Sequence, residues 1–151
     1  MILNRFKNLI QLEGFINIYE HQIEILNDKK DAVSRDLCIF GIPETEKEIF
    51  KIFNSEIKNA ASFLDIGAGI GLYTLFAISL NASASILAVE ANPKVFEVLK
   101  KNLNNFTISK TNQKLINKIV STKKSDVDFF VPMGDDFSYG TSQKILLEEK
   151  N

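Results

Sequence analysis

Two acidic residues flank a run of alternating glycines in this chain. Asp65 precedes Gly67, Gly69 and Gly71, and Glu90 follows further along. Glycines permit positive φ and leave no Cβ between the backbone and a ligand. A helix that starts directly after such a loop offers free N–H groups and the positive end of its dipole to the same ligand. The spacing of these residues therefore predicts a binding loop for a small molecule.

The residues around the loop narrow the chemistry of that molecule. A dinucleotide fingerprint needs a third glycine where this chain has Leu72, and the Gly-Lys-Ser/Thr of a P-loop does not follow. Asp65, at the end of a strand, would repel a phosphate and attract an ammonium group. Glu90, at the end of the next strand, is placed to accept two hydrogen bonds from a ribose diol. Together these features predict a nucleoside ligand with cationic rather than pyrophosphate character.

Alternating strands and helices must position these residues. A continuous apolar run, Ile86 to Val89, is typical of a parallel strand that is covered on both faces. The order of elements predicts a β-α-β-α-β unit, which places the chain in the α/β class with a Rossmann-like, doubly wound parallel sheet. The expected strands are 61–66, 85–90 and 114–121, and the expected helices are 71–80 and one capped by Asn92 and Pro93. That last helix should bury Val95, Val98, Leu99 and Leu103 and pair Glu97 with Lys101.

The sequence divides into an N-terminal helical extension, 1–60, and a partial nucleotide-binding domain, 61–151. Apolar residues between Phe6 and Leu26 recur at spacings of three and four, which predicts helix. Pro43 opens a second helix, whose expected apolar stripe is Ile49, Phe53 and Ile57. Beyond the third strand of the sheet we expect a strand at 127–131 and a loop at 133–142.

Composition and charge exclude several classes of function. The net charge of −1 over 151 residues gives no nucleic-acid footprint. Cys38 is alone, so no internal disulfide forms, and the single His21 has no cluster that would make a zinc site. No apolar run reaches the ~20 residues of a membrane span, and the N-terminus is unlike a signal peptide. We therefore expect a cytoplasmic protein that uses no metal, nucleic acid or membrane.

Four segments resemble one family. The chain is similar to class I S-adenosylmethionine-dependent methyltransferases, and most closely to the FkbM-type methyltransferases. DIGAGIGLYTLFA at 65–77 resembles their first motif, and VEANPKVFEVLKKNL at 89–103 resembles their acidic second-strand motif. ETEKEIF at 44–50 and LINKIVSTKKSDVDFFVP at 115–132 extend the resemblance, and GTS at 140–142 resembles the family less closely.

The resemblance implies a cofactor, a reaction and a set of site residues. The cofactor is S-adenosylmethionine, and the reaction is O-methyl transfer to a hydroxyl of a sugar or other small metabolite. Asp65 and the glycine loop would line its methionine end, and Glu90 would hold the ribose hydroxyls. The implied cofactor-binding residues are Asp65, Gly67, Ala68, Gly69, Tyr73, Thr74, Glu90, Ala91 and Asn92. No catalytic residue is nominated.

The resemblance covers only the first half of the family's fold. Two alternatives therefore stand beside the methyltransferase. One is a catalytically inactive remnant or the cofactor-binding half of a split methyltransferase, and the weaker one is an NAD-dependent oxidoreductase. The first strand would also keep an open apolar edge, which favours pairing with other chains. We expect the N-terminal helices to cover that edge, or a second copy or a chain that carries the missing half to pair with it.

Overall fold

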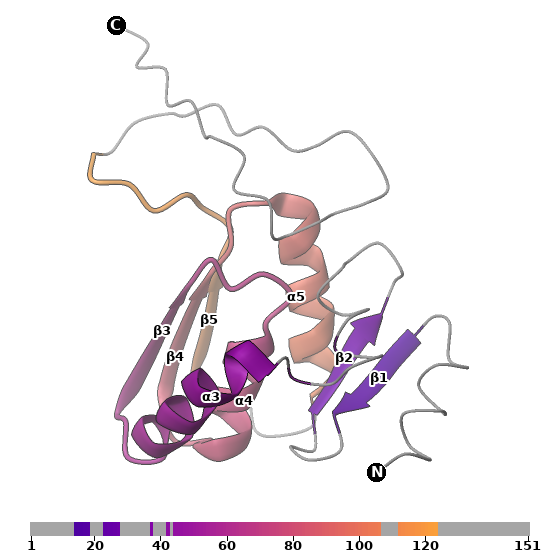
Figure 1. Ribbon diagram of the computed structural model, residues 1–151. Coiled ribbons are helices and arrows are strands. Elements are labelled where there is room, and N and C mark those ends of the chain that lie inside the picture. Colours follow the sequence, from indigo (N-terminus) through magenta and orange to yellow (C-terminus); the bar gives the residue numbers. More distant parts are fainter. Residues whose placement is uncertain are drawn as a thin grey trace, which may run out of the picture.

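The parallel sheet is the frame of the molecule. The computed structural model describes residues 14–18, 23–27, 37, 42, 44–106 and 112–123. Three parallel strands lie in the order β3-β4-β5, namely β3 (Ser62–Ile66), β4 (Ser85–Val89) and β5 (Gln113–Ile116). Helix α4 (Leu72–Leu80) follows β3 and helix α5 (Pro93–Asn105) follows β4 (Figure 1). The predicted α/β class with a parallel β-α-β-α-β unit is confirmed.

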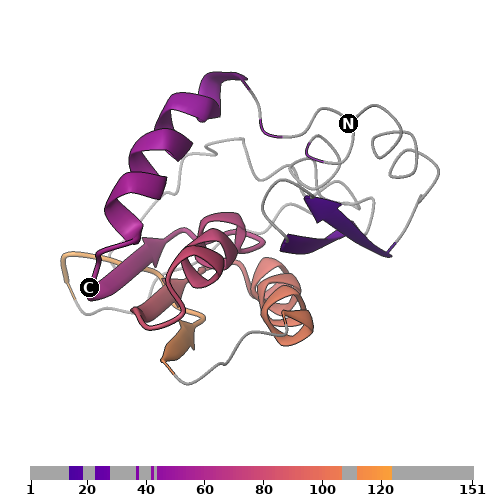
Figure 2. The same cartoon turned by 90° about the horizontal axis from the view of Figure 1, so that it is seen from below.

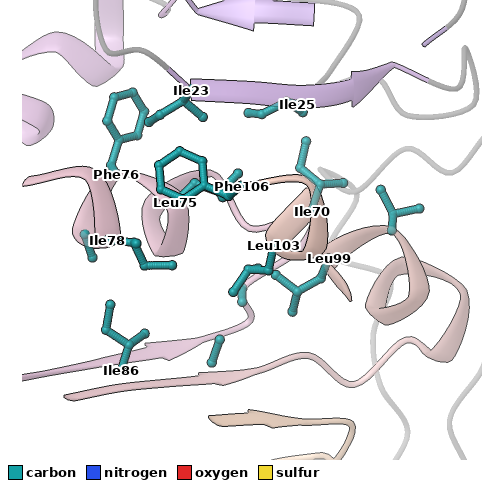
Figure 3. Close-up of a cluster of buried hydrophobic side chains, with 14 of the residues drawn as sticks. Ile23, Ile25, Ile70, Leu75, Phe76, Ile78, Ile86, Leu99, Leu103 and Phe106 are labelled. Atoms are coloured by element: carbon teal, nitrogen blue, oxygen red, sulfur yellow. The ribbon is translucent and has the colours of Figure 1, made fainter. Parts of the chain in front are cut away.

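Helix α4 lies at the centre of the core. Its residues Leu75 and Phe76 are fully buried, as expected for a helix that is apolar on nearly all sides. The sheet contributes Ile86 from one side, and the strand β2 (Ile23–Asn27) contributes Ile23 and Ile25 from the other (Figure 3). The core therefore has α4 packed between the sheet and β2, and α5 also packs against β2.

An antiparallel hairpin stands where the sequence predicted a helix. Strand β1 (Gly14–Ile18) pairs with β2, and Phe15 lies opposite Leu26. In β2, Ile23 and Ile25 are buried whereas Glu24 is exposed, which is the period of two typical of a strand. The prediction of helix across these ten residues was wrong, because short β-branched runs matched a helical spacing by coincidence.

Helix α3 (Glu44–Ile57) forms as predicted but buries a different stripe. Ile57 is 3% exposed and Phe50 4%, whereas Ile49 is 51% exposed, so the expectation that Ile49 faces the core was wrong. The ring of Phe53 packs edge-on against Phe63 of β3 at 5.3 Å. Aromatic contacts thus decide the orientation of α3. Figure 2 shows α3 at the left and the β1–β2 hairpin at the right, with α4 between them.

Helix α5 begins as the sequence predicts. The side chain of Asn92 accepts a hydrogen bond from the N–H of Lys94 at 3.0 Å, and Pro93 takes the first helical position. Glu97 pairs with Lys100 at 2.9 Å rather than with Lys101, so the i,i+4 pair was wrong and an i,i+3 pair replaces it. The predicted buried stripe is confirmed at Val95, Val98, Leu99 and Leu103.

The sheet keeps one face and one edge open within the described residues. Strand β3 pairs with β4 and with no other described strand, and Leu64 and Ile66 are 55% and 57% exposed. Strand β5 ends at Ile116, earlier than the expected residue 121. That the N-terminal segment or another chain covers the β3 edge stays a prediction. The division of the chain into 1–60 and 61–151 also stays a prediction. His21, Cys38, Pro43, the strand at 127–131 and the loop at 133–142 lie outside the described residues.

Candidate cofactor site

The glycine loop turns at the carboxyl end of the sheet. The φ values of Gly67, Gly69 and Gly71 are 77°, 56° and 94°. Residues with a Cβ adopt this backbone conformation only at a steric cost. The N–H groups of Gly67 and Ala68 both donate to the carbonyl of Val89, at 2.8 and 3.0 Å. The loop that follows β3 is therefore fixed directly over the end of β4.

The three glycines face different surroundings. A Cβ built on Gly67 or Gly69 would meet nothing within 4 Å. A Cβ built on Gly71 would lie 2.5 Å from Cδ1 of Leu99 on α5. The first two glycines therefore border open space beside the loop, where a ligand can approach the backbone. The third glycine lets α4 start in close contact with α5.

Glu90 connects the loop to the start of α5. One carboxylate oxygen, Oε2, accepts from the N–H of Gly69 at 2.9 Å, and the other, Oε1, accepts from the N–H of Asn92 at 2.8 Å. A carboxylate has about four acceptor positions, so each oxygen keeps capacity for a ligand hydroxyl. The side chain of Asn117 donates to the carbonyls of Glu90 and Ala91 at 2.8 and 3.0 Å, which fixes the backbone beside this carboxylate.

Asp65 interacts electrostatically with Glu90, which directly follows the neighbouring strand β4. The hydroxyl of Thr74, which is fully buried, donates to Oδ2 of Asp65 at 2.6 Å. Burial raises the pKa of Asp65 above its ordinary value, and the charge of Glu90 adds to the rise, while hydrogen bonds from Thr74 oppose it. A cationic ligand would favour the ionised carboxylate, because an opposite charge stabilises it. This carboxylate is therefore suited to an ammonium or sulfonium group.

Tyr73 ties helix α3 to the same site. Its hydroxyl donates to Oε2 of Glu46 at 2.7 Å, and its ring stacks on Phe50 at 4.8 Å. Burial, followed by the bond to Glu46, raises the pKa of Tyr73, so the hydroxyl stays protonated and remains a donor. Glu46 is thereby a third carboxylate near the site, contributed by α3.

The structure places all the predicted site residues at one end of the sheet. Asp65 lies near the end of β3, and the others lie in the loop after β3, in the first turn of α4 and in the segment after β4. Sequence reasoning missed Glu46 and Asn117, which bind Tyr73 and the Glu90 carbonyl directly. It also missed Asn102, which binds the carbonyl of Ile70 in the glycine loop. Asn102 carried a readable signal, because it continues the apolar stripe of α5 at helical spacing. That the predicted residues contact a cofactor stays a prediction.

Asp65→Asn is expected to stabilise the protein at neutral pH. The folded pKa of Asp65 exceeds its unfolded value near 3.8, so this group's contribution to stability falls as the pH rises through the folded pKa. Asparagine keeps an acceptor for Thr74 without the buried charge. We expect the free energy of unfolding to rise by about 0.5–1 kcal/mol.

Urea unfolding of both proteins at neutral and acidic pH measures this effect. The gain should disappear as the pH falls below 3.8, where both folded and unfolded Asp65 are protonated. A less stable Asp65→Asn protein at neutral pH would contradict the prediction, because the ionised carboxylate would then stabilise the fold.

Comparison with known proteins adds one family and several solved structures. The family model described as Conserved hypothetical protein 95 matches residues 43–129, which is more than half of the chain. Among the curated proteins, none matches this chain. No helix in the described part of the chain has both the length and the apolar character needed to cross a membrane.

The chain is similar to solved methyltransferases. A precorrin-6y C5,15-methyltransferase from Geobacter metallireducens is 26% identical with a TM-score of 0.39, over 46% of this chain and 37% of that one. An S-adenosylmethionine-dependent methyltransferase from Agrobacterium tumefaciens is 16% identical with a TM-score of 0.42, over 50% and 25%. A protein-L-isoaspartate O-methyltransferase is 19% identical with a TM-score of 0.40, over 48% and 23%. The chain thus spans well under half the length of each.

Proposed function

The chain belongs to the Conserved hypothetical protein 95 family, and we propose that it binds S-adenosylmethionine and takes part in methyl transfer. The observation that carries this proposal is the pair of carboxylates at the ends of adjacent parallel strands. Glu90 is bound to the N–H groups of Gly69 and Asn92, and Asp65 lies close to it with a raised pKa. Open space borders the loop between them.

The charges and the hydrogen-bond acceptors of the site fit this cofactor. Its amino acid end carries an ammonium group and its sulfur is a sulfonium, so both prefer a site lined by carboxylates rather than by lysine or arginine. The spare acceptor positions of Glu90 suit the two ribose hydroxyls. Gly67 and Gly69 have no Cβ, and a Cβ built on either would meet nothing within 4 Å, so the backbone is open on the side where the ligand would lie.

The cofactor would supply an electrophilic methyl group, and the residues of this chain would hold and orient it. Asp65 would bind the ammonium group, with Thr74 keeping the carboxylate in place through its 2.6 Å hydrogen bond. We propose O-methylation of a sugar or other small metabolite, as in the FkbM-type methyltransferases that the sequence resembles. We also propose a reduced, cytoplasmic setting, because the sequence has a single cysteine.

Calorimetric titration of the full chain tests the cofactor assignment. S-adenosylmethionine should bind with a 1:1 stoichiometry, and NAD should give no heat of binding, because Asp65 repels the pyrophosphate. Asp65→Asn is the matched variant, since it removes the charge and keeps the shape. Binding of NAD in preference to S-adenosylmethionine would overturn the proposal.

A second candidate is the cofactor-binding part of an enzyme that another chain completes. It is favoured by the exposed Leu64 and Ile66 on the sheet and by the unpaired edge of β3 among the described strands. We propose that a second copy, or a chain carrying further strands, pairs with this edge. Light scattering after size-exclusion chromatography distinguishes the arrangements, since a clean monomer would exclude self-pairing.

A further inference from the structure

Asn102 is a fully buried polar residue in the apolar face of α5. Its amide nitrogen donates to the carbonyl of Ile70 at 2.8 Å, and its amide oxygen accepts from the N–H of Leu26 at 2.8 Å. One side chain thus joins the glycine loop to strand β2. A buried amide with both partners is favourable, whereas the loss of either partner leaves an unsatisfied polar group.

The bond to Ile70 acts between two loop residues that have positive φ. Ile70 stands between Gly69 and Gly71, both of which have positive φ. Ile70 is 3% exposed and belongs to the core. The peptide that leads into Gly71 is held at both ends, because Asn102 binds the Ile70 carbonyl and the Gly71 N–H donates to the carbonyl of Ala68 at 2.9 Å. The carbonyl of Gly71 then accepts from the N–H of Leu75 at 2.8 Å in the first turn of α4.

Two side chains therefore hold the loop from either side of Gly69. Glu90 binds the N–H of Gly69 itself, and Asn102 binds the carbonyl of the next residue, Ile70. A primary amide presents a donor and an acceptor at one end, and Asn102 uses them for the Ile70 carbonyl and the Leu26 N–H together. The strand β2 fixes the orientation of that amide, because the Leu26 N–H must face its oxygen.

The hairpin is firmly attached to the helices that flank the loop. Ile23 and Ile25 are fully buried in the core, and the Asn105 side chain donates to Glu24 at 2.7 Å. We propose that Asn102 is a positioning residue of the cofactor site, through which strand β2 sets the conformation of the glycine loop. This inference rests on the proposed cofactor function and assigns the N-terminal hairpin a part in it.

The matched pair of variants is Asn102→Asp and Asn81→Asp. Asn81 also donates from a side-chain amide to backbone carbonyls, those of Ile57 and Ala60 at 2.9 and 3.0 Å. It lies after the last turn of α4, at the opposite end of that helix from the glycine loop. Each variant therefore loses a donor to backbone carbonyls, but only Asn102→Asp loses the bond to the loop.

Amide hydrogen exchange of the ligand-free full chain is the first readout. The N–H groups of Gly69 and Gly71 are hydrogen bonded, to Glu90 and to Ala68 respectively. In Asn102→Asp we expect these two amides to exchange about tenfold faster relative to the amides of the buried core residues Ile78 and Ala88. In Asn81→Asp their rates relative to the same core amides should stay unchanged.

The affinity for S-adenosylmethionine is the second readout. It should fall about tenfold in Asn102→Asp and change less than about twofold in Asn81→Asp. Asn102→Ser, which is smaller and uncharged, should shift both readouts in the same direction and serves if Asn102→Asp does not fold. Loop exchange that rises equally in the variants of both sites, or an unchanged affinity in both Asn102 variants, would overturn the role of Asn102. If the wild type does not bind the cofactor, the proposed function fails and the exchange result still decides on Asn102.

Discussion

Gly71→Ala is expected to lower the free energy of unfolding by about 2–4 kcal/mol. The added Cβ would lie 2.5 Å from Cδ1 of Leu99 and 3.5 Å from Cδ1 of Leu103, so the buried Leu99 side chain would have to leave its position between α4 and α5 or the two helices would have to shift. The φ of 94° adds strain, because L-residues with a Cβ rarely adopt it. Urea or thermal unfolding measures the change. Among the three glycines of the loop, this is the largest stability effect that we expect from an added methyl group.

Gly67→Ala is the control that separates strain from packing. Its φ of 77° is also positive, but its Cβ would meet nothing within 4 Å. We expect a smaller loss of about 1–2 kcal/mol from the backbone alone. The same methyl group would stand where the cofactor approaches, so the affinity should also fall. Equal stability losses in Gly67→Ala and Gly71→Ala would contradict the packing account of Gly71.

Glu90→Ala should weaken binding of S-adenosylmethionine by about 1–3 kcal/mol. The change removes the acceptor of the Gly69 and Asn92 N–H groups, which lie 2.9 and 2.8 Å from the carboxylate oxygens. It also removes the acceptors proposed for the ribose hydroxyls. Calorimetry at neutral pH gives the affinity, and hydrogen exchange at Gly69 shows whether the loop has opened as well.

Two further variants sharpen the result for Glu90. Glu97→Ala removes a carboxylate from α5 whose side chain is 59% exposed and paired with Lys100, so it should leave the affinity unchanged. Glu90→Gln keeps one acceptor oxygen but turns an N–H donor toward one of the two backbone N–H groups, so it should also bind more weakly. If Glu90→Ala and Glu97→Ala bind the cofactor equally well, Glu90 has no part in the site.

The strands, the helix start and the glycine loop that form the site could be predicted from local sequence signals. Parallel strands that follow one another through a helix end at the same edge, so Asp65 and Glu90 had to be neighbours once the β-α-β-α-β order was recognised. Asn92 and Pro93 are a strong start signal for a helix, and α5 begins there. The alternating glycines permitted positive φ, and all three have it.

Contacts between distant segments were beyond the reach of sequence reasoning. The hairpin is stabilised by burial of Ile23 and Ile25 against α4 and α5, and that tertiary environment overrides a spacing that also fits a helix. Glu46 fits the first turn of α3 as a partner of the helix dipole, and nothing local shows that it meets Tyr73. The orientation of α3 likewise follows from the ring contacts of Phe50 and Phe53.

The assignment of Glu90, Asp65 and the glycine loop to S-adenosylmethionine is tested most directly by backbone amide NMR of the wild type. Addition of the cofactor should shift the amide signals of Gly67, Ala68, Gly69 and Asn92 most strongly. The N–H groups of Gly69 and Asn92 donate to Glu90, and those of Gly67 and Ala68 belong to the loop that follows Asp65. Signals from the exposed sheet residues Leu64 and Ile66 should move little. Saturating cofactor that leaves the loop amides unshifted would contradict the account.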